Sequence, residues 1–262
     1  MSQYWQDRET DALNRVSNKT IRQTEKQLTK YYSDVMTRTL ADFEAVYNKI
    51  LTTVGEGKEP TPADLYKLDT YWQHQAQVRA ELNKLGEKQI ALLSKQFELN
   101  FFDVYFAVGT VGEVAFSTID KPLVQQMINS VWCADGKSWS QRIWKNTELL
   151  AETLNEELIH CVASGKKPTE LKKLLMNRFD VSYQNADMLV RTEIAHIQAQ
   201  AALKRYEDAG VLEVQVWASE DERRCENCGK LHKKKYLITE HVPIPNHPNC
   251  RCNVVPVVES II

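Results

Sequence analysis

Cys225-Glu226-Asn227-Cys228 and His247-Pro248-Asn249-Cys250-Arg251-Cys252 form two short clusters of thiol and imidazole groups, separated by eighteen residues near the end of this 262-residue chain. Zinc takes four such ligands in a tetrahedron, and two close pairs can supply them. The predicted ligands of a Zn2+ ion are Cys225, Cys228, His247 and Cys250. Cys252 is the alternative to Cys250, because side chains two apart on an extended segment point the same way. His232 and His241 are weaker candidates.

The predicted role of the zinc is structural. A catalytic zinc keeps one position open for water, and no obvious general base stands beside the two clusters. The segment between them, Gly229 to Lys235, is expected to form a hairpin tip or knuckle. Six cysteines in a large chain without a signal peptide favour thiols or metal ligation over disulfides. The remote Cys133 and Cys161 are expected to pack as small hydrophobic residues.

Short strands surround the clusters. Residues 211–218 alternate apolar and polar side chains, which predicts a half-buried strand, and further strands are predicted at 235–238 and 254–257. Residues 211–262 are therefore expected to be a small zinc-stabilised α+β lobe. Because its core is small, the ion should supply much of its folding free energy.

The first half of the chain is predicted to be helical. Residues 7–54 contain neither proline nor glycine, and apolar residues recur at steps of three and four, as in one long helix or two in tandem. That stripe suits either an ordinary bundle or an oligomer interface. After a break at 55–60, Thr61 and Pro62 are expected to start a second long helix that reaches about Tyr105. Its apolar continuation, residues 100–116, would be a kinked helix or an interface.

Shorter helices are predicted between residues 131 and 210. After a turn-rich loop at 131–140, a helix capped by Ser138 or Ser140 should run to Ser164, and a short one should cover 168–179. Ser182 is expected to cap another, ending at Gly210. The predicted fold is thus mainly α, with a helical arm or bundle (1–130), a compact helical domain (131–210) and the zinc lobe (211–262).

Composition restricts the class of protein only loosely. The chain is 43% hydrophobic and 26% charged, with a net charge of −2, so any attraction to nucleic acid must be local. The N-terminus lacks the apolar core of a signal peptide, and no apolar run is long enough to cross a membrane. We therefore expect a soluble chain made in a cytoplasm, without a membrane partner.

Glu-x-x-His occurs twice, at Glu157/His160 and Glu193/His196. In di-iron helical bundles this spacing places the carboxylate and the imidazole on one helix face, toward two metal ions. Those sites also need a bridging glutamate from each of two other helices. The short helix expected between the two motifs offers none. A metal-dependent enzyme, either this di-iron type or a zinc nuclease on the Cys/His lobe, is the alternative function. Nearby, Arg191 and Glu193 cannot pair along one helix face, so each is expected to anchor a different segment.

A basic run lies between the two metal-ligand clusters. It reads either as a solvated knuckle or as a non-specific phosphate contact that would weaken steeply with salt. The residues of the second reading are Arg223, Arg224, Lys230, Lys233, Lys234 and Lys235.

Four pieces of the C-terminal half occur in a specific order and spacing: residues 132–144 (WCADGKSWSQRIW), the helix with Arg191-Thr192-Glu193, residues 221–228 (DERRCENC) and residues 247–252 (HPNCRC). Together they resemble the minor head, or head-morphogenesis, proteins of tailed bacteriophages of the Mu F-like type. Leu231-His232-Lys233 departs from the Leu-Asp-Gly of many relatives, which predicts a different hairpin tip. Relatives vary at the position of Cys252, which ranks it below Cys250.

The resemblance implies a virion structural protein with no enzymatic activity, present in few copies inside the capsid and made in the host cytoplasm. Its implied partners are the phage portal protein and the major capsid or scaffolding protein. Non-specific contact with packaged DNA is a further implied interaction. The N-terminal helices fit the family only loosely. Some relatives carry an appended toxin or enzyme domain, and because nothing follows Ile262 we expect none here.

Overall fold

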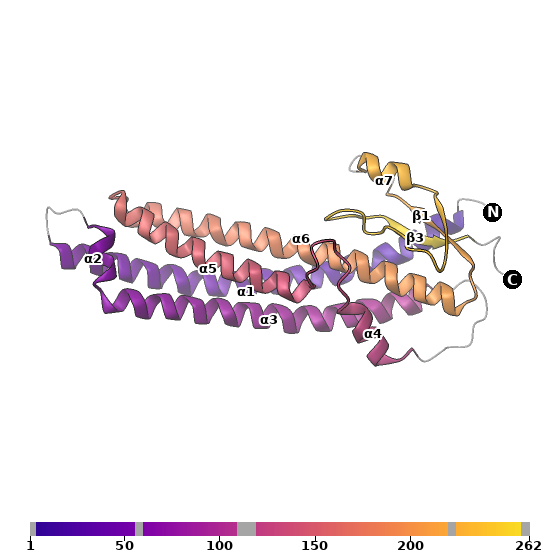
Figure 1. Ribbon diagram of the computed structural model, residues 1–262, viewed down its shortest axis with the longest axis horizontal. Helices are drawn as coiled ribbons and strands as arrows, with labels where there is room; N and C mark the ends of the chain where they lie inside the picture. The colour runs from indigo at the N-terminus through magenta and orange to yellow at the C-terminus, as the bar shows by residue number, and fades with distance from the viewer. Residues whose placement is uncertain (1–3, 56–59, 109–118, 220–223, 258–262) are drawn as a thin grey trace. The chain divides into compact units, whose positions relative to one another are not determined.

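The structure, a computed structural model, describes residues 4–55, 60–108, 119–219 and 224–257. Within these ranges the chain is mainly helical with a small C-terminal sheet, which confirms the predicted class (Figure 1). None of the described helices combines the length and apolarity needed to cross a membrane. The elements in order are α1 (Tyr4–Val54), α2 (Pro62–Tyr66), α3 (Asp69–Ala107), α4 (Lys121–Ile128), α5 (Trp139–Ala163), α6 (Pro168–Asp208), β1 (Glu213–Trp217), α7 (Glu226–Leu231), β2 (Lys235–Leu237) and β3 (Asn253–Pro256).

The elements form two compact units, and neither is continuous in sequence. The mixed unit comprises residues 1–25, 92–139 and 188–262, and the helical unit comprises 26–91 and 140–187. Helices α1, α3 and α6 have residues in both units. Division of the chain into separate domains at residues 130 and 210 stays a prediction.

The helical unit packs segments of α1, α3, α5 and α6 side by side (Figure 1). Its core follows the predicted spacing of three and four residues, because that spacing keeps apolar side chains on one helix face. Fully buried members include Phe43, Tyr47, Ile50, Leu82, Leu85, Leu154 and Phe179. Cys161 is buried in this core as a small hydrophobic residue, as predicted.

Two predictions of helix ends can be compared with the structure. Thr61 caps α2 as expected: its hydroxyl accepts the Asp64 amide hydrogen, and the Asp64 carboxylate accepts the Thr61 amide hydrogen. The expected single helix from there to Tyr105 is wrong, because α2 ends at Tyr66 and α3 begins only at Asp69. Asp69 places an acid in the first turn of α3, where the helix dipole favours it.

The predicted break between residues 179 and 182 is also wrong, since α6 is one helix of 41 residues. No glycine or proline occurs from 169 to 209, and Ser182 does not act as a cap. Its carbonyl accepts a hydrogen bond from the Tyr32 hydroxyl at 3.3 Å inside the helical unit. Gly210 follows the helix with a φ of 72°, as expected of a C-terminal glycine.

The sheet of the mixed unit has the order β2-β1-β3 with antiparallel neighbours. All three strands lie where they were predicted, but β1 is not half-buried: Val214 to Trp217 are all buried, including Gln215 at 8% exposure. β1 is the central strand, and β3 beside it is buried along its whole length. The sheet therefore belongs to the apolar core of its unit.

Candidate metal centre

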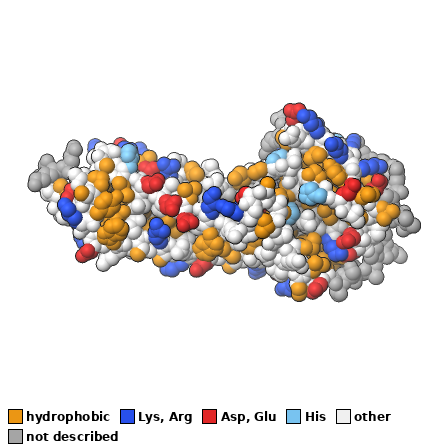
Figure 2. Space-filling view, viewed as in Figure 1, with side chains coloured by type: hydrophobic (Ala, Val, Ile, Leu, Met, Phe, Trp, Pro, Cys, Tyr) orange, Lys and Arg blue, Asp and Glu red, His pale blue; other side chains and the backbone are white. Residues whose placement is uncertain are grey.

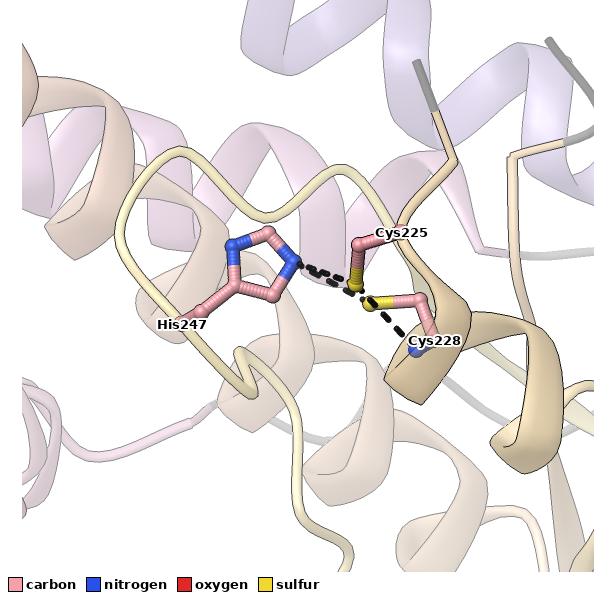
Figure 3. Close-up of side chains that lie close together, drawn as sticks. All are labelled: Cys225, Cys228 and His247. Carbon is pink, nitrogen blue, oxygen red and sulfur yellow. Dashed lines mark hydrogen bonds between the residues drawn. The ribbon is translucent and has the colours of Figure 1, made fainter. Parts of the chain in front are cut away.

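The first ligand pair is presented by the start of a short helix. Cys225 is the N-cap of α7, and its Sγ accepts the backbone N–H of Cys228 at 3.3 Å. Gly229 lies inside α7, so the expected hairpin tip is shifted toward Lys233, which has a φ of 64°. The cap holds the Cys225 and Cys228 side chains on the same side of the first helical turn (Figure 3).

The second pair is presented by a tight turn. The amide of Cys250 donates to the carbonyl of His247 at 3.1 Å, and Asn249 has a φ of 59°. Proline in the second position and a positive φ in the third are the features of a type II turn. This turn places His247 and Cys250 at its first and fourth positions, on either side of the reversed chain.

The two pairs lie beside each other, with Cys228 in contact with both members of the second pair. The His247 Nε2 atom lies 3.3 Å from the Cys225 Sγ and 3.2 Å from the Cys228 Sγ (Figure 3). The Sγ atoms of Cys228 and Cys250 are 3.8 Å apart. Around a tetrahedral zinc, the bond lengths imply ligand separations of roughly 3.8 Å between two sulfurs and roughly 3.6 Å between sulfur and nitrogen. Cys225, Cys228 and His247 therefore lie close enough to share one ion of this size, and Cys250 adjoins them through Cys228.

Cys252 is also part of the cluster. The potential ligand atoms of Cys228, Cys250 and Cys252 lie within 4.8 Å of one another, as do those of Cys225, Cys228 and His247. The two groups share Cys228 and together contain five candidate ligands, one more than a tetrahedral zinc takes. All six cysteines of the chain are free thiols, as predicted.

The thiols differ in their tendency to ionise. A hydrogen bond from the Cys252 thiol lowers the pKa of Cys250 to about 5, whereas the same hydrogen bond and burial raise the pKa of Cys252. Hydrogen bonding by the Cys228 amide lowers the pKa of Cys225, and burial raises the pKa of Cys228 to about 12. Metal ligation requires thiolates, and a bound cation would lower the pKa of each thiol that ligates it, so either Cys250 or Cys252 can complete the set with Cys225, Cys228 and His247.

Arg191, Thr192 and Glu193 each bind a different segment within the mixed unit. Arg191 pairs with Glu25 of α1, and the Glu193 carboxylate accepts the Trp132 indole N–H at 2.9 Å. The prediction that Arg191 and Glu193 anchor separate segments is confirmed. Thr192, between them, accepts the amide hydrogen of Asn249, in the turn at residues 247–250, at 3.1 Å. The sequence contained no sign of this third contact, because 57 residues separate the partners.

Neither Glu-x-x-His motif forms part of a metal cluster in the described ranges of the chain. Glu157 accepts a hydrogen bond from Arg178 at 2.9 Å, and His160 lies beside Lys166. In the second motif, the His196 ring stacks on Trp132 with 4.3 Å between centroids. The residues of both motifs are used in packing and ion pairing, which counts against the di-iron alternative.

The weaker histidine candidates have other surroundings. His232 Nδ1 accepts the backbone N–H of Ala218 at 3.2 Å, and its ring contacts Trp217. His241 is exposed. Neither belongs to the groups of ligand atoms described above.

Most of the predicted basic run is exposed at the junction of α7 and β2. Arg224, Lys230 and Lys233–Lys235 are exposed, whereas Arg223 lies outside the described residues. Lys230 forms an ion pair with Glu226 at 2.6 Å, and the Lys233 ammonium lies 5.1 Å from the centroid of Trp217. Figure 2 shows blue side chains on this part of the surface.

Comparison with known proteins gives one family match. Residues 152–255 contain α6, β1, β2, most of β3 and the whole Cys/His cluster, and they match the family described as phage Mu protein F like protein. This segment is similar to the Mu F-like family. The match confirms the inferred resemblance and includes three of the four sequence pieces, with residues 132–144 lying before it.

One curated relative is similar over a longer stretch. The chain is 24% identical over 188 residues to the NAD(+)–arginine ADP-ribosyltransferase EFV of Enterococcus faecalis, a match that covers 64% of this chain. The chain spans only 38% of that relative's length. No solved structure matches the chain.

Proposed function

We propose that this protein is a minor capsid protein of a tailed phage, a low-copy component of the virion that acts in head morphogenesis. The Mu F-like match over residues 152–255 carries the proposal. Its partners would be the portal protein and the major capsid or scaffolding protein, on the inner side of the capsid. The chain would act by binding and not by catalysis.

The metal centre would be structural in this role. The close approach of Cys225 and Cys228 to His247 supports this role, because one ion held there would connect the start of α7 to the turn at 247–250. Such a connection would stiffen the region between β1 and β3. The exposed side of α7 and of the segment that follows it would then be a rigid surface for assembly.

The assembly role is tested by producing phage heads with and without this protein. We expect it to copurify with the portal protein of the same phage and to be present in few copies in assembled heads, as counted by quantitative mass spectrometry. A protein that stays a free monomer beside portal and capsid proteins, and is absent from finished heads, would contradict the proposal.

DNA contact is the second part of the proposal, and the exposed lysines 233–235 support it. Binding by these side chains would release counterions, so affinity should fall steeply with salt. Replacing Lys233, Lys234 and Lys235 by alanine should reduce the salt slope by about 3 if each contacts one phosphate. The exposed lysines 145, 172 and 173 of the helical unit provide a control with the same charge change. If the dependence of DNA affinity on salt is the same for both triple variants, lysines 233–235 do not contact DNA.

A metal-dependent nuclease on the same cluster is the competing function. It would need the ion to hold a reactive water, whereas the two groups that share Cys228 offer five thiol and imidazole ligands for four positions. We therefore expect the zinc-loaded protein to leave DNA intact. Cleavage that is lost on chelation and restored by zinc would favour the nuclease.

A further inference from the structure

The peptide group that joins Pro248 and Asn249 is held at both ends. It is the central peptide of the type II turn, and in such a turn its N–H and C=O point to opposite sides. Asn249 has the positive φ that this orientation requires, whereas a type I turn would need a negative value. The orientation of this one peptide therefore decides which groups the turn can bind.

The N–H end is bound by α6. The Thr192 hydroxyl donates its hydrogen to the Met188 carbonyl at 2.7 Å, which turns a lone pair outward from the helix. That lone pair accepts the Asn249 amide hydrogen at 3.1 Å. The rigid helix thereby fixes the central peptide.

The C=O end is bound by a predicted metal ligand. The Nδ1 atom of His247 lies 2.7 Å from the Pro248 carbonyl oxygen. A carbonyl can only accept, so the ring proton is on Nδ1 and the Nε2 lone pair is free to ligate. That Nε2 is the atom that faces the sulfurs of Cys225 and Cys228 (Figure 3).

We propose that Thr192 is a positioning residue of the metal centre, which orients the His247 imidazole through the Pro248–Asn249 peptide. The inference rests on the proposed zinc site. Without the threonine hydroxyl, the peptide can flip, the Pro248 carbonyl turns away from Nδ1, and the ring loses its fixed tautomer and direction. Groups that orient metal ligands in this way typically change metal affinity by about 10- to 100-fold.

The test is the rate at which the full-length, zinc-loaded protein loses zinc to a coloured chelator. Thr192→Val keeps the side-chain shape and should speed release by about 10- to 100-fold, with Thr192→Ser close to wild type. Thr153→Val is the matched control, because Thr153 donates to the Leu149 carbonyl of its own helix in the same way, at 2.9 Å. Asn249→Gly keeps both the amide and the positive φ, and should release zinc at the wild-type rate.

The outcomes separate the two proposals. Wild-type protein that binds no zinc would overturn both. Zinc-binding wild type with equal release from Thr192→Val would overturn only the positioning role. If the valine variant fails to fold, Thr192→Ala is measured instead, and release at the wild-type rate from that variant likewise overturns the role of Thr192.

Discussion

The Sγ atoms of Cys228 and Cys250 lie 3.8 Å apart, although 22 positions separate the two residues in sequence. Both are buried, at 3% and 4% exposure. Two thiolates so close together in a buried site would repel each other, and a bound cation would offset their charge. The finding joins the two sequence clusters into one centre and is the basis of the metal predictions.

Removing the metal should destabilise the protein. With free zinc at about a thousand times its Kd, binding adds about 4 kcal/mol to the free energy of unfolding. Chelation should therefore lower Tm, and added zinc should restore it. The measurement is thermal unfolding with chelator, with and without excess zinc, and an unchanged Tm in both conditions would count against a structural ion.

The two final cysteines should differ in their importance. Cys250→Ser should abolish stoichiometric zinc binding, because it removes the thiolate that lies against Cys228. Cys252→Ser should retain one zinc per chain, since Cys225, Cys228, His247 and Cys250 remain and a serine hydroxyl can still donate to Cys250. Metal content after gel filtration checks both. The opposite result, with zinc lost only from Cys252→Ser, would make Cys252 the fourth ligand.

Gly86 in α3 should resist a substitution that normally stabilises helices. A Cβ atom at this position would lie 2.7 Å from the Trp144 ring of α5, closer than real Cβ contacts. Gly86→Ala should therefore lower the free energy of unfolding by about 1–3 kcal/mol, instead of raising it by up to about 1 kcal/mol. The comparison is Gly229→Ala in α7, where the nearest atom is 3.8 Å away.

The same change in a Trp144→Ala background isolates the cause. There the ring is absent, so Gly86→Ala should regain its ordinary stabilising effect. Urea unfolding of the four proteins gives the coupling free energy directly. A Gly86→Ala effect that is independent of Trp144 would mean that the close approach is not what requires glycine.

Acid should weaken the helical unit through His74. Burial lowers its pKa to about 4, below the ordinary value of 6.5, and its Nε2 has no hydrogen-bond partner in the described part of the chain. Between these two pKa values the unfolded chain binds the proton more readily, so the free energy of unfolding falls as pH falls. The loss should reach roughly 3 kcal/mol by pH ~4 and be absent above pH ~7.

His74→Leu should remove this part of the pH dependence. The measurement is the free energy of unfolding by urea, for wild type and variant, between pH ~7.5 and ~4.5. Subtracting one curve from the other removes the contribution of the other titrating groups. Parallel curves for the two proteins would show that the folded state protonates His74 without cost.

The candidate metal ligands could be found in the sequence because their signals are local. A Cys-x-x-Cys pair at a helix start and a His-Pro-Asn-Cys turn each place two candidate ligands within four residues, whatever the rest of the fold. The long helices were likewise readable from their apolar spacing, and Gly210 and Thr61 from their capping chemistry.

The errors came from long-range packing. Serine is a common helix cap, but no glycine or proline interrupts residues 169–209. Ser182 therefore lies inside a continuous helix, where it contacts Tyr32 of α1. The alternation of apolar and polar residues in β1 indicated one solvent-exposed face. Gln215 is nevertheless buried, because β1 is the central strand. The role of Thr192 depends on a partner 57 residues away, which no local pattern could indicate.

Native mass spectrometry of the full chain, purified without added metal, tests the central claim most directly. The account predicts one zinc per folded chain and no zinc in the variant in which both Cys228 and His247 are replaced. Folded protein that carries no metal, or that carries two irons held through Glu157/His160 and Glu193/His196, would contradict it.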